Sequence, residues 1–281
     1  MISESFDYVR PQSLQEAIAA LAEGGEDAKP LAGGPSLLPL MKLRLAVPSL
    51  LVDLQGLPGL SGIQRENGTL RIGALTRHAA LQTAELGVIS EIAGKIADQQ
   101  VRNRGTIGGS LAHGDPASDL PTLMVALEGS VTAQGPGGQR VIEAADLFED
   151  YLSTSVATGE ILTEVRLPAL DGYGGAYEKF TRRAEDWAMV GVCVVVKESG
   201  GVVDDVRIGM TNMGSTPLRA SAAEEALRGA PLDAASIAAA AEHADEGTDP
   251  PADLNATAEY KRHLARVLTR RALMRAAGIQ E

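Results

Sequence analysis

The chain of 281 residues carries 25 Lys and Arg against 37 Asp and Glu, which gives a formal net charge of -12 at pH 7. An overall negative field repels nucleic acid and anionic membranes, so we expect neither as a partner. A hydrophobic content of 44% is typical of globular proteins, and the length suffices for two domains. No apolar run approaches the roughly 18 residues of a membrane span, and the N-terminal MISESFDYVR lacks a signal-peptide pattern. We therefore expect a cytoplasmic protein with no membrane span.

The one cysteine, Cys193, limits the chemistry of this chain. Iron–sulfur clusters usually take four cysteine ligands and a disulfide takes two, so this chain alone forms neither. Cys193 lies within the apolar run from Val190 to Val196, and we expect a buried, unreactive thiol. His113 and Asp115 resemble a metal-binding pair, but two ligands make a poor site, and we predict no metal.

The first elements follow from capping and glycine signals. Residues 13–16 form a capping box, and helical spacing of apolar residues continues to Gly24-Gly25. A strand through Pro30 and Leu31, a helix over residues 36–44 and a strand at 50–54 should follow. These predictions describe a small αβαβ unit.

A second unit begins with the alternating pattern of residues 68–73, which predicts a strand, and Thr76 is expected to cap the next helix. Helices are predicted at 88–99 and 116–127, and strands at 130–133 and 161–167. Turn-forming residues gather at 170–175, where we place a domain boundary.

The remaining chain changes in character. Three strands are predicted at 177–182, 189–197 and 202–212, with a hairpin at 199–201, and three helices at 219–227, 233–244 and 255–277. The last helix carries a row of cations, which we interpret as a solvated face, with subunit docking as the alternative: Lys261, Arg262, Arg266, Arg270, Arg271 and Arg275.

Two glycine pairs stand out, one in the segment from Lys29 to Arg44 and one in the segment from Arg104 to Pro121. Adjacent glycines allow consecutive N–H groups to converge on an anion, although a plain turn is the commoner use of such a pair. Neither segment has the Lys of a P-loop or the three glycines of a Rossmann motif. Two such loops suggest a long cofactor that contains a diphosphate.

Three motifs carry a family resemblance: AGGPSLLPLMKLRL at Ala32 to Leu45, TIGGSLAHGDPASDLP at Thr106 to Pro121, and YEKFTRRAEDWAMVGV at Tyr177 to Val192. In this order they resemble the FAD-binding medium subunit of molybdenum hydroxylases. The resemblance implies an α+β fold with a vanillyl-alcohol-oxidase-type FAD-binding domain at 1–174, made of two α/β subdomains that meet near residue 57. A small C-terminal domain at 175–281, with a three-stranded antiparallel sheet and helices, should follow.

The resemblance also implies the residues that hold FAD. N–H groups of the first loop should surround the pyrophosphate, with the second loop on the other side of the cofactor. Pro35 has no N–H and would contribute shape only. The implied set is Pro30, Leu31, Ala32, Gly33, Gly34, Pro35, Ser36, Leu37, Ile96, Thr106, Ile107, Gly108, Gly109, Ser110, Ser118, Asp119, Leu162 and Lys179.

Some of these residues have particular expected roles. Asp119 should accept from a ribityl or ribose hydroxyl, with a helix-terminal carboxylate as the alternative. Ile96 and Leu162 match positions beside the isoalloxazine, and Lys179 matches a basic residue near its pyrimidine end, where a cation raises the flavin potential. Arg183 and Asp186 are expected to form an ion pair. Valine at Gly33 or Gly109 should abolish FAD retention without unfolding the chain.

By this resemblance the chain is the FAD subunit of a heterotrimeric hydroxylase. It would relay electrons from [2Fe-2S] clusters to a terminal acceptor, with a small iron–sulfur subunit and a large molybdopterin subunit as partners in a dimer of heterotrimers. No catalytic residue is assigned in this chain. Two alternatives stay open: a self-contained FAD oxidoreductase, for which His113 is the candidate base, and a nucleotide-binding module without redox function.

Overall fold

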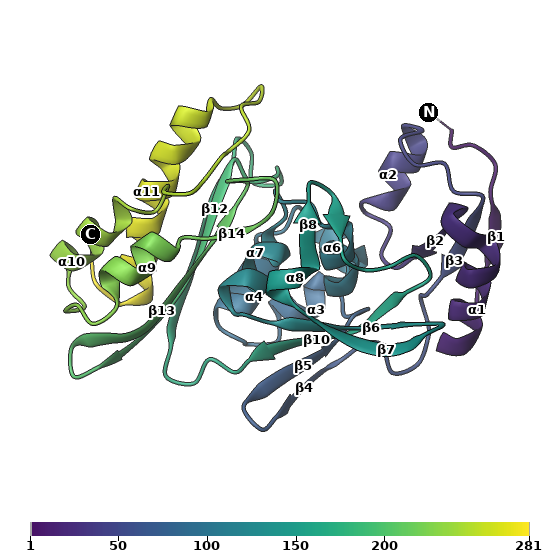
Figure 1. The fold of residues 1–281 in the computed structure, drawn as a ribbon, viewed down its shortest axis with the longest axis horizontal. Coiled ribbons are helices and arrows are strands. Elements are labelled where there is room, and N and C mark those ends of the chain that lie inside the picture. Colours follow the sequence, from purple (N-terminus) through teal and green to yellow (C-terminus); the bar gives the residue numbers. More distant parts are fainter. Residues whose placement is uncertain (1, 281) are drawn as a thin grey trace.

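The computed structural model describes residues 2–280 as three main sheets in a row, with the N-terminal and C-terminal units at opposite ends of an elongated molecule (Figure 1). Each unit has its own hydrophobic core. Among the described residues, no helix is both long enough and apolar enough to cross a membrane.

The N-terminal unit is a parallel three-stranded sheet in the order β1-β3-β2. Helix α1 covers it and begins as predicted, because the Ser13 hydroxyl accepts from the Glu16 N–H at 3.2 Å. Its apolar face, with Ala17 and Leu21, packs against Val52. The elements are β1 (Asp7–Val9), α1 (Leu14–Gly24), the 3-10 turn η1 (Gly25–Asp27), β2 (Ala28–Leu31), α2 (Leu37–Lys42) and β3 (Leu50–Asp53).

The central unit has an antiparallel five-stranded sheet in the order β4-β5-β10-β6-β7. Its helices pack on the sheet around the largest core. The strands are β4 (Ile63–Glu66), β5 (Thr69–Gly73), β6 (Ser130–Gly135), β7 (Gly138–Glu143) and β10 (Ile161–Pro168), with a separate pair β8 (Phe148–Asp150) and β9 (Ser153–Thr154). The helices are α3 (His78–Gln82), α4 (Val88–Gly94), α5 (Gln99–Arg104), α6 (Ile107–His113), α7 (Asp119–Ala126) and α8 (Ala144–Leu147).

Two local predictions in this unit were wrong. The helix expected at 88–99 ends at Gly94, because Ala97 takes a positive φ of 40° and Asp98 then caps α5 by accepting from the Val101 N–H. Thr76 does not cap α3. Its hydroxyl instead bonds both the N–H and the carbonyl of Gly62, so it fastens a turn to the sheet.

The C-terminal unit is an antiparallel sheet of four strands, not three, in the order β11-β12-β13-β14. The additional strand β14 has only two residues, too few for a period-two pattern. The strands are β11 (Gly174–Phe180), β12 (Val190–Ser199), β13 (Val202–Thr211) and β14 (Leu218–Arg219). Helices α9 (Ser221–Leu227), α10 (Ala234–Ala241) and α11 (Ala258–Ala276) cover one face (Figure 1).

Strand β12 is buried on both faces, which explains its unbroken apolar sequence. Val192 and Val194 face the C-terminal helices, whereas Cys193 and Val195 belong to the central core. The prediction for Cys193 is confirmed: the side chain is fully buried, and burial raises the pKa of its thiol above the ordinary value.

The cationic row on α11 is only in part the solvated face that the sequence predicts: Arg270, Arg271 and Arg275 are exposed, whereas Lys261, Arg262 and Arg266 are buried or half-buried. Lys261 is completely buried and pairs with Asp253 at 2.7 Å. Arg266 pairs with Asp245 at 2.7 Å, and Arg275 pairs with Glu178 of β11 at 3.0 Å. These cations fasten the helix to its surroundings.

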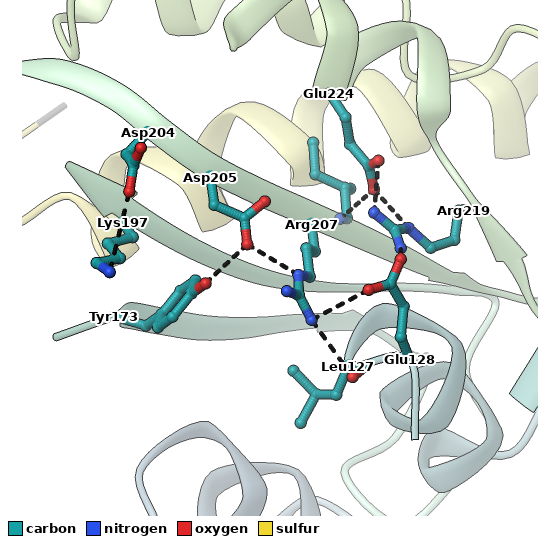
Figure 2. Close-up of polar contacts among 10 residues, drawn as sticks. Leu127, Glu128, Tyr173, Lys197, Asp204, Asp205, Arg207, Arg219 and Glu224 are labelled. Carbon is teal, nitrogen blue, oxygen red and sulfur yellow. Dashed lines mark hydrogen bonds and ion pairs between the residues drawn. The ribbon is translucent and has the colours of Figure 1, made fainter. Parts of the chain in front are cut away.

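A polar network joins the central and C-terminal units beyond the C-terminal end of α7 (Figure 2). Glu128 accepts from Arg219 at 2.6 Å and lies 3.3 Å from Arg207. Arg219 also pairs with the buried Glu224, at 2.7 Å. Helix α7, which begins at Asp119, lies directly on β13. The approach is so close that a Cβ on Gly209 would come within 2.7 Å of the Thr122 carbonyl oxygen.

Candidate functional site

A cavity of about 720 Å³ is lined by residues from all three units. Its size falls in the range of cofactor and ligand sites, roughly 300–1,000 Å³. Every residue of the predicted set except Ile107 lines it: Pro30, Leu31, Ala32, Gly33, Gly34, Pro35, Ser36, Leu37, Ile96, Thr106, Gly108, Gly109, Ser110, Ser118, Asp119, Leu162 and Lys179. The fold thus brings together residues that are up to about half the chain apart in sequence.

The first glycine loop presents backbone donors that the protein does not use. Within residues 2–280, the N–H groups of Ala32, Gly33, Gly34 and Ser36 have no protein acceptor. Gly34 has a φ of 93°, which favours glycine. The loop lines the cavity directly before α2 begins. Its free N–H groups are therefore neighbouring hydrogen-bond donors on one wall of the cavity, as an anion site requires.

The second glycine pair differs from the expectation, because it lies in the first turn of α6 and its donors are occupied. The Gly108 N–H bonds the Ala74 carbonyl at 2.8 Å, and the Gly109 N–H bonds the Thr106 hydroxyl at 3.2 Å. Ile107 donates to the Thr76 carbonyl, and its side chain is buried in the central core, outside the cavity lining. These glycines therefore serve close packing: a Cβ on Gly108 would meet that of Ala74 at 2.6 Å.

Three serine hydroxyls line the cavity without a protein partner among the described residues. Ser36 precedes α2 but makes no side-chain capping bond, and Ser118 does the same before α7. Ser110 is the third. Hydroxyls donate and accept, so together with the free N–H groups they can bind a ligand rich in phosphate and hydroxyl oxygens.

Asp119 and Lys179 form a buried ion pair at the cavity wall. Lys179 Nζ lies 3.0 Å from Asp119 Oδ2, and the side chains are 5% and 6% exposed. The Tyr177 hydroxyl donates to Asp119 Oδ1 at 2.5 Å. Burial raises the pKa of the Asp119 carboxyl, while Lys179 and Tyr177 act in the opposite direction. The ammonium of Lys179 is therefore paired with a carboxylate in this structure.

Other candidate residues occupy different positions. His113 ends α6 and lines the cavity. Arg183 and Asp186 do not form the expected ion pair in the described structure; instead the Asp186 N–H donates to the Arg183 carbonyl in a turn. No cluster of three potential metal-binding side chains occurs among residues 2–280.

The sequence analysis missed several residues at the cavity. His78 lines it and is 5% exposed; burial, and then Arg77 and Arg102, lower its pKa to about 4. Trp187, 58% exposed, lies within the third motif, and Leu152 lies in a loop without a motif; both also line the cavity. Tyr177 could have been found, because it precedes Lys179 by two residues and therefore shares its face of β11.

Family comparisons match almost the whole chain. Residues 4–170 match the FAD binding domain in molybdopterin dehydrogenase, and residues 175–276 match the CO dehydrogenase flavoprotein C-terminal domain. These matches include all three sheets and the whole predicted cofactor set.

Curated and solved relatives agree with these matches. The chain is 43% identical to the 6-hydroxypseudooxynicotine dehydrogenase complex subunit alpha of Paenarthrobacter nicotinovorans, over 97% of this chain and 94% of that protein. It is 44% identical to a chain of a solved carbon monoxide dehydrogenase from Hydrogenophaga pseudoflava, with a TM-score of 0.96 over 99% of each chain. A chain of quinoline 2-oxidoreductase from Pseudomonas putida 86 is 34% identical, with a TM-score of 0.94 over 99% of each chain. The chain therefore belongs to the FAD-binding medium subunits of the molybdenum hydroxylases, which are FAD-dependent oxidoreductase subunits.

Proposed function

We propose that this chain holds FAD in the cavity between its three sheets and relays electrons from [2Fe-2S] clusters of a partner subunit to a terminal acceptor. The observation that carries the proposal is the row of unused N–H groups from Ala32 to Ser36 on the cavity wall. Bound FAD supplies redox chemistry that no side chain of this chain offers. The protein's own task is to bind and orient it.

The residues present fit such a cofactor. The free N–H groups of Ala32, Gly33, Gly34 and Ser36 would donate hydrogen bonds to the pyrophosphate. The Ser36, Ser110 and Ser118 hydroxyls would supply further hydrogen bonds. Asp119 would accept from a ribityl or ribose hydroxyl, because each of its oxygens keeps a lone pair after binding Tyr177 or Lys179. Ile96 and Leu162 would flank the isoalloxazine.

Lys179 would lie near the pyrimidine end of the flavin. Its ammonium is 3.0 Å from the Asp119 carboxylate, so the ionised pair carries no net charge. Its effect on the flavin potential is then smaller than that of an unpaired cation, and its first role is to keep Asp119 charged in a buried position.

The proposal includes the partners and the domain organisation. With one cysteine, this chain depends on a small iron–sulfur subunit and a large molybdopterin subunit, in a dimer of heterotrimers. The relative named as subunit alpha of a dehydrogenase complex supports a multi-subunit assembly. We place a vanillyl-alcohol-oxidase-type FAD-binding domain at 1–174, divided near residue 57, and the C-terminal domain at 175–281. A hydrophobic core centred on each of the three sheets supports that division, although Tyr177, Cys193 and Val195 of the C-terminal sheet pack into the central core.

Reconstitution with FAD tests the binding site. The purified chain should show flavin absorption bands, and Ser36→Ala and Ser118→Ala should each weaken FAD binding. Ser61→Ala, at an exposed serine outside the cavity lining, is the matched control and should bind FAD as the wild type does. An FAD-free wild-type protein after reconstitution would refute the proposal and favour a nucleotide-binding module.

Copurification tests the relay. The tagged chain, co-expressed with the genes that neighbour its own, should copurify with one iron-containing and one molybdenum-containing subunit. A lone chain that oxidises a substrate at full rate, and loses this activity on His113→Ala, would instead favour the self-contained oxidoreductase.

A further inference from the structure

Tyr177 is a fully buried side chain that bonds directly to a residue of the cavity wall. Its hydroxyl donates to Asp119 Oδ1 at 2.5 Å, while its ring packs in the central core. A buried tyrosine costs more than a phenylalanine unless its hydroxyl is paired, so this position uses the polar atom. Asp119 already has a cation, Lys179, to balance its charge.

Two residues outside β11 fix the position of Tyr177. The Arg275 guanidinium of α11 donates to its backbone carbonyl at 2.9 Å, and the Lys95 ammonium that follows α4 donates to the same oxygen. Lys95 Nζ also lies 5.6 Å from the centre of the Tyr177 ring. With the backbone and the ring both held, the hydroxyl has a defined place.

The neighbouring strand leaves space for this hydroxyl. Gly191 is the second residue of β12 and stands between the buried Val190 and Val192. A Cβ at that position would come within 2.5 Å of the Tyr177 hydroxyl and 2.8 Å of the Thr211 hydroxyl. Glycine weakens a strand interior, so its presence here marks the close approach of these groups.

The carboxylate of Asp119 is consequently held at two separate points. Oδ1 accepts from Tyr177, and Oδ2 accepts from Lys179 at 3.0 Å. Either contact alone would leave the carboxylate free to rotate about its χ2 torsion, which has broad minima. The two together fix the plane of the carboxylate and so the direction of its remaining lone pairs.

We propose that Tyr177 is a positioning residue, which orients the Asp119 carboxylate to accept a hydrogen bond from a hydroxyl of the bound cofactor. This inference rests on the proposed FAD site and assigns a role to a residue that does not line the cavity. Burial and the adjacent carboxylate raise the pKa of the Tyr177 phenol well above its ordinary value, so the group stays a donor at all working pH values.

FAD affinity in a double-mutant cycle tests the role. We expect Tyr177→Phe to raise the FAD dissociation constant of the reconstituted chain about tenfold, which corresponds to about 1.4 kcal/mol. In an Asp119→Ala background, where the acceptor is gone, Tyr177→Phe should produce no further change. Flavin fluorescence quenching gives the dissociation constants, and thermal unfolding of each apoprotein gives the effect on the fold.

A matched control is a second tyrosine close to Tyr177 in sequence. Tyr173 also donates its hydroxyl to a carboxylate, Asp205, at 2.7 Å (Figure 2), and neither residue of this pair lines the cavity. Tyr173→Phe removes the same kind of bond and should leave the FAD dissociation constant unchanged. If Tyr177→Phe also leaves it unchanged, or weakens FAD binding equally with and without Asp119, the inference is wrong while the FAD site stands. If the wild type takes up no FAD, the proposed function itself fails.

A second variant keeps the test available if Tyr177→Phe does not fold. Gly191→Ala retains every polar group but places a methyl against the Tyr177 hydroxyl. It should weaken FAD binding in the wild-type background and have no such effect in the Asp119→Ala background. An equal loss in both backgrounds would contradict the positioning role.

Discussion

Arg219 Nη1 lies 2.6 Å from Glu128 Oε1, and this contact joins strand β14 to the loop that follows helix α7. The first residue of α7, Asp119, pairs with Lys179 of β11. One helix of the central unit is therefore held to the C-terminal sheet at both ends. The two contacts differ in burial, because the Glu128 side chain is 60% exposed and that of Asp119 only 6%. We expect their contributions to stability to differ accordingly.

At the exposed end, removal of Glu128 and removal of Arg219 should have unequal effects. Glu128→Gln should lower the free energy of unfolding by at most about 1 kcal/mol, and less in high salt, since exposed pairs are screened. Arg219→Met leaves the Glu224 carboxylate, 4% exposed, with the Ile208 N–H as its one remaining donor. This substitution should lower the free energy of unfolding by about 3 kcal/mol. Urea unfolding measures both. Lys197→Met, at the exposed pair with Asp204, is the control and should have little effect; equal losses for Glu128→Gln and Arg219→Met would contradict this ranking.

At the buried end, Lys179→Met should destabilise the apoprotein in a pH-dependent way. Without the cation, burial raises the pKa of the Asp119 carboxyl further above the unfolded value of about 3.9. A carboxyl that holds its proton more tightly when folded loses stability as pH rises between those two pKa values. We expect a loss of about 3 kcal/mol at pH 8 and a smaller one at pH 5. Addition of Asp119→Asn to Lys179→Met should restore most of the lost stability. A stability loss that does not depend on pH would show that the Asp119 carboxyl is not its cause.

The two glycine pairs should respond differently to alanine. A Cβ on Gly33 would lie 2.2 Å from the Arg104 carbonyl oxygen, which is backbone and cannot rotate away. Gly33→Ala should therefore lower both the melting temperature and the FAD affinity. Valine at this position should likewise destabilise the fold, whereas the sequence predicts a loss of FAD retention without unfolding. A Cβ on Gly109 would meet only the Thr106 hydroxyl, at 2.7 Å, which is the movable end of a side chain. Gly109→Ala should be the milder change in calorimetry and FAD titration; the reverse order would disprove the packing argument.

The stability that the buried pair of Lys261 and Asp253 contributes should depend on pH. Burial acts to raise the pKa of Asp253, but hydrogen bonds from Lys261 and from two backbone N–H groups prevail and lower it. Such a carboxylate stabilises the fold above its unfolded pKa and stops doing so as pH falls through its folded pKa. The stability difference between the wild type and Lys261→Met should therefore be largest near neutrality and shrink below about pH 4. Unfolding measured at several pH values checks this, and a difference that grows in acid would count against the pair.

Local signals in the sequence predicted a large part of the fold. The Ser13 cap, the hairpin at Gly200-Gly201 and the apolar pattern of β12 all act over a few residues, and each prediction is confirmed. The short strand β14 depends on its pairing with β13, so no local pattern announces it. The helical pattern places Lys261 in solvent, because it contains no sign of the partner, Asp253, which lies outside the helix.

The cavity was predicted mainly through the family motifs, and its chemistry required the structure. Motif glycines look alike in sequence, yet only the first pair leaves its N–H groups free, because the Gly108 N–H donates to the Ala74 carbonyl and the Gly109 N–H to the Thr106 hydroxyl. The pairing of Lys179 with Asp119 joins residues of different units, so their spacing in sequence carries no trace of it.

The shared wall of the cavity has a consequence for cooperativity. Each of the three sheets has a separate core, but residues of all three line the cavity. Opening of any one unit would remove part of the wall, so a ligand that binds only the closed wall opposes the opening of each unit. Cofactor occupancy should therefore add to the packing that already joins the units, and loss of the cofactor should leave the chain more open to local unfolding and proteolysis.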